Sequence, residues 1–141
     1  MRATAPRVFV DTGAWFALQA TDDRHHEHAR RVFPTLLTRF QTLVTTNHVV
    51  AETYTLLRRA KGYRHAREFL DILDRSPRLV RSFVSADLER ETRLLLHRYA
   101  EHPFSFVDGT SFVVMKRERI HHAFAFDVQF SIAGFIRIPG A

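Results

Sequence analysis

The sequence contains no cysteine among its 141 residues. This absence excludes a disulfide framework and metal sites built from thiolates, and it fits a reducing compartment. Long apolar runs are also missing. Asp11 interrupts the first apolar stretch, which therefore does not match a signal peptide, and no run approaches the roughly 20 residues that a membrane-spanning helix needs. We expect a cytoplasmic protein that has no membrane partner.

Residues and segments that would interrupt a compact fold are equally scarce. The sequence has five prolines and five glycines, and no repeat, low-complexity tract or flexible linker divides it. Hydrophobic residues make up 45% of the composition, as in ordinary globular proteins. A chain of roughly 150 residues buries about two-thirds of its unfolded surface, which is enough for a hydrophobic core. We therefore expect residues 1–141 to form a single domain.

Lysine is rare, since two lysines and nineteen arginines make up the 21 basic residues, and the net charge is +6. The planar guanidinium group binds phosphate with two parallel hydrogen bonds, which an ammonium group cannot do. The charge favours a polyanionic partner. A solvated basic surface explains it equally well.

Short apolar segments alternate with helical patterns along the chain. The segments predicted as strands are 8–11, 42–46, 79–84, 123–126 and 135–138. Helices are predicted at 14–20, 48–60, 67–75 and 87–100, with a turn and then a helix in 21–33 and a further transition into a helix within 105–119. Asn47 is the predicted cap of its helix, and Pro34 is expected to kink or restart the second one. This alternation predicts an α/β fold, a three-layer α/β/α sandwich with a central parallel sheet.

Four acidic residues stand in apolar surroundings at the boundaries of these elements or within them. Asp11 and Asp127 follow predicted strands, Asp108 opens a helix, and Glu52 lies within the apolar stretch HVVAETYTLL. Functional groups in open α/β sheets gather beyond the carboxyl ends of the strands. Each acid alone also has a structural explanation: a helix cap for Asp11 and Asp108, a turn for Asp127, and an ion pair with Arg58 for Glu52. Capping does not explain Glu52, so the joint pattern favours a shared site.

Four carboxylates in one place would need a cation. Two of them about 4 Å apart repel each other by roughly 4 kcal/mol at an effective dielectric constant near 20. Ligand sets made only of oxygen select hard ions such as Mg²⁺ or Mn²⁺. Such an ion can activate a water molecule and orient it toward a phosphodiester, while basic side chains hold the polyanion.

The segments VDTGAWFAL, TTNHVVAETYTLL, SFVDGTSFVVM and AFAFDVQFSIAGF resemble the four acidic motifs of the PIN domain. Their order and spacing are similar to those of VapC-type toxins, and the resemblance covers residues 8–138. It implies a PIN-like sandwich and an Mg²⁺- or Mn²⁺-dependent endoribonuclease, the toxin of a toxin–antitoxin pair. The metal-binding and catalytic acids implied by the resemblance are Asp11, Glu52, Asp108 and Asp127.

The resemblance also implies polar side chains that support the acids. Thr110 or Ser111 matches a hydroxyl that forms supporting hydrogen bonds, and Asn47 matches a polar position ahead of the second acid. Thr12 follows the first acid, but Gly13 replaces the serine often found next.

The partners implied are an RNA substrate, a cognate antitoxin and a second copy of the chain. Trp15, Phe16 and Phe40 are candidates for a partner surface, and burial in the core is the alternative. Candidate RNA contacts lie in two basic runs, in which solvated surface is the alternative: Arg58, Arg59, Lys61 and Arg64 in the first, and Lys116 and Arg117, close in sequence to Asp108, in the second.

Two histidines, His25 and His28, have the i, i+3 spacing of a chelating pair, but no further ligand pattern accompanies them, which favours a solvated helix start. The leading alternative to an endonuclease is an RNA- or protein-binding module whose acidic pocket docks a basic partner without cleavage. A phosphoryl-acceptor domain is disfavoured because its lysine at a late strand end is missing, Lys116 being within a predicted helix. Assays of RNA cleavage with Mg²⁺ or Mn²⁺ distinguish the first two.

Overall fold

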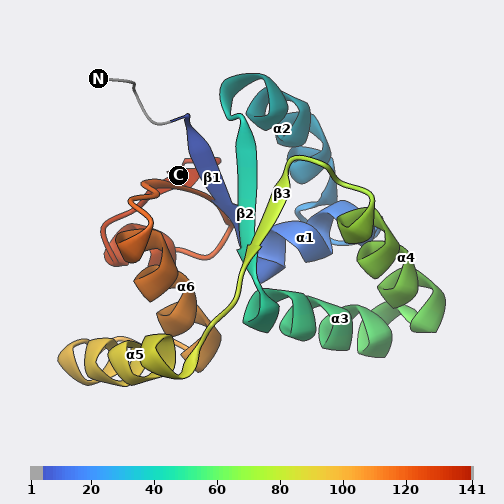
Figure 1. Ribbon diagram of the computed structural model, residues 1–141. Helices are drawn as coiled ribbons and strands as arrows, with labels where there is room; N and C mark the ends of the chain where they lie inside the picture. Colours follow the sequence, from blue (N-terminus) through green and yellow to red (C-terminus); the bar gives the residue numbers. More distant parts are fainter. Residues whose placement is uncertain (1–4, 141) are drawn as a thin grey trace.

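The computed structural model describes residues 5–140, in which five strands form one sheet (Figure 1). The strands are β1 (Arg7–Val10), β2 (Thr42–Thr46), β3 (Leu79–Ser82), β4 (His122–Phe124) and β5 (Ile136–Ile138). Their order in the sheet is β3-β2-β1-β4-β5, and every neighbouring pair is parallel. The predicted parallel sheet is confirmed. The last three strands are shorter than predicted, and β4 ends two residues early, at Phe124.

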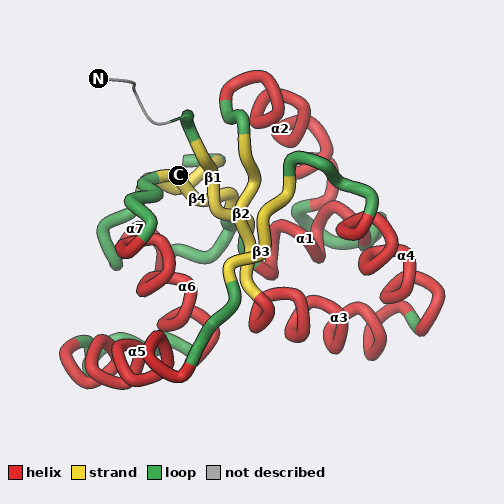
Figure 2. The backbone as a smooth tube through the Cα atoms, viewed as in Figure 1, coloured by secondary structure: helices red, strands yellow, loops and turns green. Residues whose placement is uncertain are grey.

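Helices cover both faces of this sheet (Figures 1 and 2). Four of them, α1 (Thr12–Gln19), α2 (His26–Arg39), α3 (Asn47–Lys61) and α4 (Tyr63–Asp74), lie on one side. On the other side lie α5 (Ala86–Arg98), α6 (Phe106–Arg117) and α7 (Gln129–Ile132), the last of which was not predicted. The three-layer α/β/α sandwich is therefore as expected. Among residues 5–140, no helix combines the length and apolar character needed to cross a bilayer.

Aromatic side chains fill the space between the layers. Phe112 of α6 packs edge-to-face against Phe130 of α7, with ring centroids 5.0 Å apart, and Phe130 also contacts Phe9 of β1. Because both faces of the sheet are covered, the apolar residues 8–10 of β1 and 43–44 of β2 are all buried. Trp15 and Phe40, considered as partner contacts, belong to this core, with exposures of 4% and 3%.

One prediction about a helix cap was wrong, and of the two outcomes expected at Pro34 the restart is excluded. Thr46, not Asn47, caps α3, since its hydroxyl oxygen accepts a hydrogen bond from the Val49 N–H at 3.0 Å. Asn47 instead accepts a bond from the Val84 N–H at 2.7 Å and so ties the start of α3 to the segment after β3. Pro34 does not restart a helix, because α2 continues through it from His26 to Arg39.

Candidate active site

The site lies where the chain connections on either side of the sheet diverge. From β1 the chain proceeds to β2 over one face, while β4 is reached over the other, so that a crevice opens beyond the carboxyl ends of β1 and β4. The Asp11 N–H donates a hydrogen bond to the Phe124 carbonyl oxygen at 3.0 Å, which fixes the residue after β1 beside the end of β4. The side chain of Asp11 is almost fully buried, with 5% exposure for the residue.

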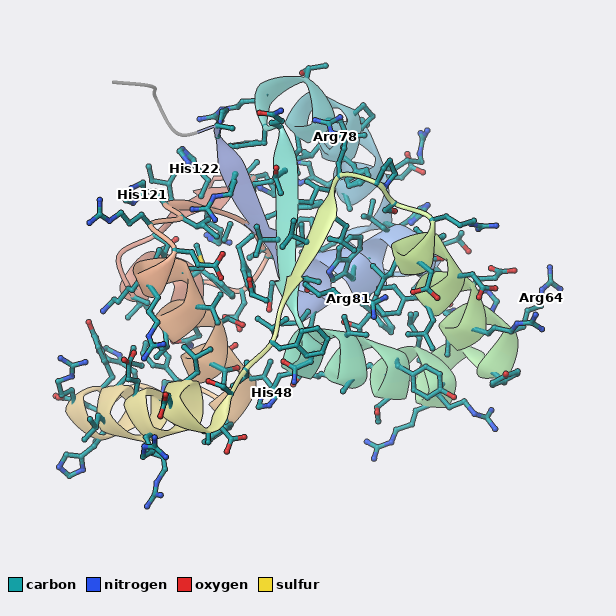
Figure 3. The ribbon with its side chains drawn as sticks, in the orientation of Figure 1. His48, Arg64, Arg78, Arg81, His121 and His122 are labelled. Atoms are coloured by element: carbon teal, nitrogen blue, oxygen red, sulfur yellow. The ribbon has the colours of Figure 1, made fainter. Side chains whose placement is uncertain are left out.

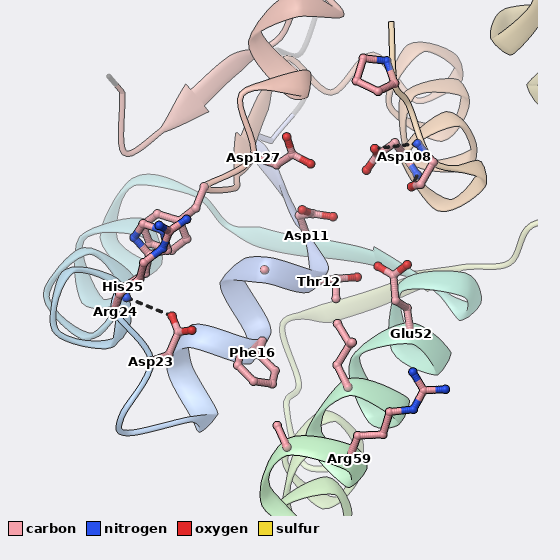
Figure 4. A pocket seen from close by; sticks show the side chains of 16 residues that line it. Asp11, Thr12, Phe16, Asp23, Arg24, His25, Glu52, Arg59, Asp108 and Asp127 are labelled. Atoms are coloured by element: carbon pink, nitrogen blue, oxygen red, sulfur yellow. Dashed lines mark hydrogen bonds between the residues drawn. The ribbon is translucent and has the colours of Figure 1, made fainter.

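All four predicted acids line a single pocket of about 800 Å³ (Figure 4). Asp11 comes from the end of β1, Glu52 from the second turn of α3, Asp108 from the first turn of α6 and Asp127 from the loop after β4. Figure 4 shows their carboxylates around a common space. The fold thus brings together four side chains that are widely separated in the sequence.

The surroundings of two of these acids, Asp11 and Asp108, raise their pKa values. Burial raises the pKa of Asp11 from 3.8 to about 7, and the charges of the three other acids add to the rise, against an opposing contact with the Thr12 backbone N–H. Burial also raises the pKa of Asp108, with smaller contributions from the charges of Asp127 and Glu52. Since burial and like charges both disfavour ionisation, a cation in the pocket would relieve both effects.

Two of the acids, Asp108 and Asp127, do have local structural roles at a helix start and in a turn. Each uses only one carboxylate oxygen for this role. Asp108 accepts a hydrogen bond from the Ser105 N–H through Oδ2, while the Ser105 hydroxyl oxygen accepts one from the Asp108 N–H, both at 3.0 Å. This is a reciprocal capping box. Asp127 accepts a bond from the Gln129 N–H through Oδ1 at 2.9 Å. In both residues the second carboxylate oxygen remains available to the pocket.

The local roles do not account for the other two acids. The Asp11 side chain forms no capping hydrogen bond with α1. The Arg58 guanidinium, the suggested partner of Glu52, lies over the Tyr63 ring at 5.6 Å from its centroid. Within residues 5–140, no salt bridge involves Glu52. A shared site remains the explanation for these two carboxylates.

Of the four predicted supporting residues, only Thr12 lines the pocket. Its hydroxyl oxygen is buried and has no hydrogen-bond partner in the part of the chain that the structure describes. The Thr110 hydroxyl donates to the Val107 carbonyl oxygen of its own helix at 2.8 Å. The Ser111 hydroxyl is buried and likewise without a partner among the described residues, and Asn47 bonds to Val84.

The donor set fits a hydrated hard ion. Between residues 5 and 140, no three acidic or histidine side chains lie close enough together to form a complete set of ligands for one ion. Mg²⁺ is usually held by one or two carboxylates and keeps several of its waters, so it does not need a closed set. Four carboxylates around an open pocket, with the unpartnered Thr12 hydroxyl beside them, match that requirement.

Comparison with known proteins identifies the family. The sequence matches the PIN domain over residues 8–136. The chain belongs to the PIN domain family.

One relative, VapC20, is similar to this PIN domain in both sequence and structure. A curated protein of Mycobacterium tuberculosis, the 23S rRNA-specific endonuclease VapC20, is 42% identical over 132 residues, which cover 93% of this chain and 97% of the relative. The crystal structure of VapC20, described as a sarcin–ricin loop cleaving toxin, has a TM-score of 0.85 at 40% identity and covers 92% of this chain and 96% of that one.

More distant structures share the fold. VapBC2 of Rickettsia felis, bound to a DNA fragment from its promoter, has a TM-score of 0.68 at 16% identity, covering 93% of this chain and 96% of that one. FitAcB of Neisseria gonorrhoeae has a TM-score of 0.61 at 13% identity, with coverage of 92% and 95%. Both confirm the PIN fold of the chain.

One arginine of the first basic run reaches the acidic pocket of this PIN domain. Arg59 lines it, next to Glu52 on α3 (Figure 4). Lys61 forms an ion pair with Asp22. Arg64 lies near Glu68, with Nε and Oε1 3.4 Å apart, and points away from the sheet on the outer side of α4 (Figure 3).

The second basic run lies far from the acids, although it is close to Asp108 in the sequence. Lys116 and Arg117 end α6, whereas Asp108 is in its first turn. At about 1.5 Å per residue, the two ends of this helix are more than about 10 Å apart. Arg117 pairs with Glu91 of α5, with Nε and Oε1 3.1 Å apart. Glu118 pairs with Arg7 at the start of β1, which places this end of α6 near the amino end of β1, away from the carboxyl ends where the acids lie.

The pocket wall formed by the α1–α2 connection and the segment before Asp127 carries residues that the sequence did not indicate as part of this site. They are Asp23, Arg24, His25 and Phe126. The His25 ring stacks on Phe126, with centroids 4.3 Å apart and planes 10° from parallel. The histidine cluster was noticed in the sequence, but nothing local indicated that an aromatic ring about a hundred residues later would cover it.

Proposed function

We propose that this protein is an endoribonuclease toxin that hydrolyses phosphodiester bonds of RNA with the help of Mg²⁺ or Mn²⁺. The observation that carries the proposal is the convergence of Asp11, Glu52, Asp108 and Asp127 on one pocket in a PIN domain. The relative named as specific for 23S rRNA is aligned over nearly the whole of both chains. We therefore propose the sarcin–ricin loop of 23S rRNA as the substrate, residues 1–141 as one nuclease domain, and the cytoplasm as the place of action.

The chain's own residues would bind the ion and orient the RNA. One or two of the four acids would hold the ion directly, through carboxylate oxygens that do not already accept backbone hydrogen bonds, and the others would act through its waters. When bound, it would polarise the phosphate and activate a water molecule for attack. The Thr12 hydroxyl is free to donate a hydrogen bond to a carboxylate or to the phosphate. Arg59 and Arg24, both in the pocket lining, would offset the charge of the flanking phosphates.

A cognate antitoxin would control such an activity. The VapBC2 and FitAcB structures take their names from toxin–antitoxin pairs of this fold. We propose that an antitoxin inhibits this protein by placing a basic side chain among the four acids, and that the toxin forms a homodimer. Co-expression with the neighbouring reading frame should relieve the growth arrest caused by the toxin alone.

The substitution Asp108→Asn tests the proposed activity. An asparagine side-chain oxygen can still accept the hydrogen bond of the Ser105 N–H, so the capping box and the fold should persist. The loss of one carboxylate should lower the rate of cleavage of a sarcin–ricin loop hairpin by about 100-fold or more. Asp87→Asn is the matched control, since Asp87 is an exposed acid in the first turn of α5.

Cleavage products are separated on denaturing gels, with Mg²⁺, with Mn²⁺ and with EDTA. Full activity of the Asp108→Asn protein would contradict the proposed role of the four acids. RNA binding by the wild-type protein without any ion-dependent cleavage would instead favour a binding module.

A further inference from the structure

The pocket has a second wall whose chemistry differs from that of the acids. We propose that the His25–Phe126 stack is a nucleobase-binding platform, which holds one unpaired base of the RNA beside the phosphodiester that is cleaved. This inference rests on the proposed ribonuclease function and names the part of the substrate that the pocket recognises. It assigns a role to His25, which lies in the α1–α2 connection outside the four acidic motifs.

The position of the stack supports this role. Both rings belong to the lining of the pocket that contains the four acids. Phe126 directly precedes Asp127, so a base stacked there would lie next to the carboxylates. Figure 4 shows His25 and Arg24 on one side of Asp11 and Asp127, and Glu52 with Arg59 on the other.

The size and composition of the pocket also support the binding of a nucleobase. A volume of about 800 Å³ is far larger than one ion and one phosphate require, and it lies in the range of sites that enclose whole organic ligands. Apolar side chains, Phe16 and Leu56 as well as Phe126, share the lining with the acids. Sequence-specific RNA recognition mostly targets unpaired bases, which stack on aromatic and histidine rings.

The arginines of the pocket suggest the path of the strand. No salt bridge between described residues involves Arg24 or Arg59. Each is therefore available for a phosphate, one on either side of the acids. A strand that contacts both would pass its scissile phosphate over the acids and bring an adjacent base to His25 and Phe126.

A purely structural role for the stack can be separated from base binding. His28 also contacts the Phe126 ring, with centroids 6.0 Å apart and planes inclined at 58°, but it does not line the pocket. Loss of the His28 ring would thus weaken the packing around Phe126 without removing a surface that RNA can reach. His28→Ala is the matched control for His25→Ala.

The test measures binding in the cleavage-deficient Asp108→Asn protein with Mg²⁺ present. The probe is a sarcin–ricin loop hairpin, in which each loop nucleotide in turn is replaced by an abasic one. Stacking of one base contributes roughly 1–3 kcal/mol, so one abasic position next to the cleaved bond should weaken binding by about 5- to 150-fold. With His25→Ala added, the same change should weaken binding less than about twofold. His25→Phe and His28→Ala should each keep the full effect.

Three results would overturn the platform: an abasic effect that is equal with and without His25, the absence of any sensitive position, and no binding of the hairpin. Melting temperatures of all variants identify any loss of folding, and the aromatic His25→Phe protein keeps the test valid if His25→Ala unfolds. Because the assay involves no cleavage, its outcome is separate from that of the nuclease proposal. Cleavage by the wild-type protein that is indifferent to base removal would refute the platform and leave the nuclease intact.

Discussion

The buried Asp11 carboxylate should make the stability of the metal-free protein depend on pH. Its pKa lies at about 7 in the folded protein, against an ordinary value of 3.8, because of burial and the nearby acids. In the unfolded chain both causes are removed. As pH rises between these two values, the unfolded state loses its proton first, so the free energy of unfolding falls. Above about pH 7 both states are ionised and the loss is complete.

The size of the effect follows from the two pKa values. At about 1.4 kcal/mol per pKa unit, a rise from 3.8 to about 7 corresponds to a loss of about 4 kcal/mol above pH 7. The substitution Asp11→Asn replaces the carboxyl group by a neutral one of nearly the same shape and should recover this amount at pH 8. At pH 5 the gain should be less than about 2 kcal/mol, because the folded wild-type protein is then still protonated.

Thermal unfolding followed by circular dichroism in EDTA measures this difference. In a protein of this size, about 4 kcal/mol corresponds to roughly 10–15 °C in Tm. Asp87→Asn is the control, because Asp87 is an exposed side chain paired with Arg90. A variant Asp11→Asn that is no more stable than the wild-type protein at pH 8, or a gain that is equal at pH 5 and pH 8, would refute the argument from burial and like charge.

Three further predictions concern the ion, the basic residues and the packing of α6. Mg²⁺ should raise the Tm of the wild-type protein more at pH 8 than at pH 5, because it binds ionised carboxylates; an equal rise would contradict carboxylate ligands. Arg59→Ala should raise KM for the hairpin about tenfold, whereas the double variant K116A/R117A should leave KM unchanged. If cleavage assays showed a raised KM for K116A/R117A and not for Arg59→Ala, the RNA would bind at the far end of α6 instead. Gly109→Ala should destabilise the protein by about 1–2 kcal/mol in urea unfolding, since its Cβ would lie 2.9 Å from Thr92 Cγ2, and the gain in helix propensity offsets only part of this; an unchanged midpoint would show that the helices can separate.

The sequence by itself determined the class of fold and indicated the four acids that line one pocket. Strands buried on both faces are continuous apolar runs, and helices repeat every 3.6 residues, so both are visible locally. The acids stood out because Asp11 and Glu52 interrupt such apolar runs, and within residues 5–140 the structure shows no side-chain cap by Asp11 and no ion pair of either carboxylate. Element ends were less accurate, as at β4, because neighbouring strands decide where pairing stops.

Only the tertiary structure decided which other side chains share the pocket with the acids. Lys116 is close to Asp108 along the chain, yet the length of a helix separates them, while His25 and Phe126 stack although most of the sequence lies between them. Trp15 and Phe40 could have faced a partner or the core, and packing placed both inside. The physical reason is that hydrophobic patterning specifies which face of an element is buried, whereas the neighbours of a side chain depend on how distant elements cross.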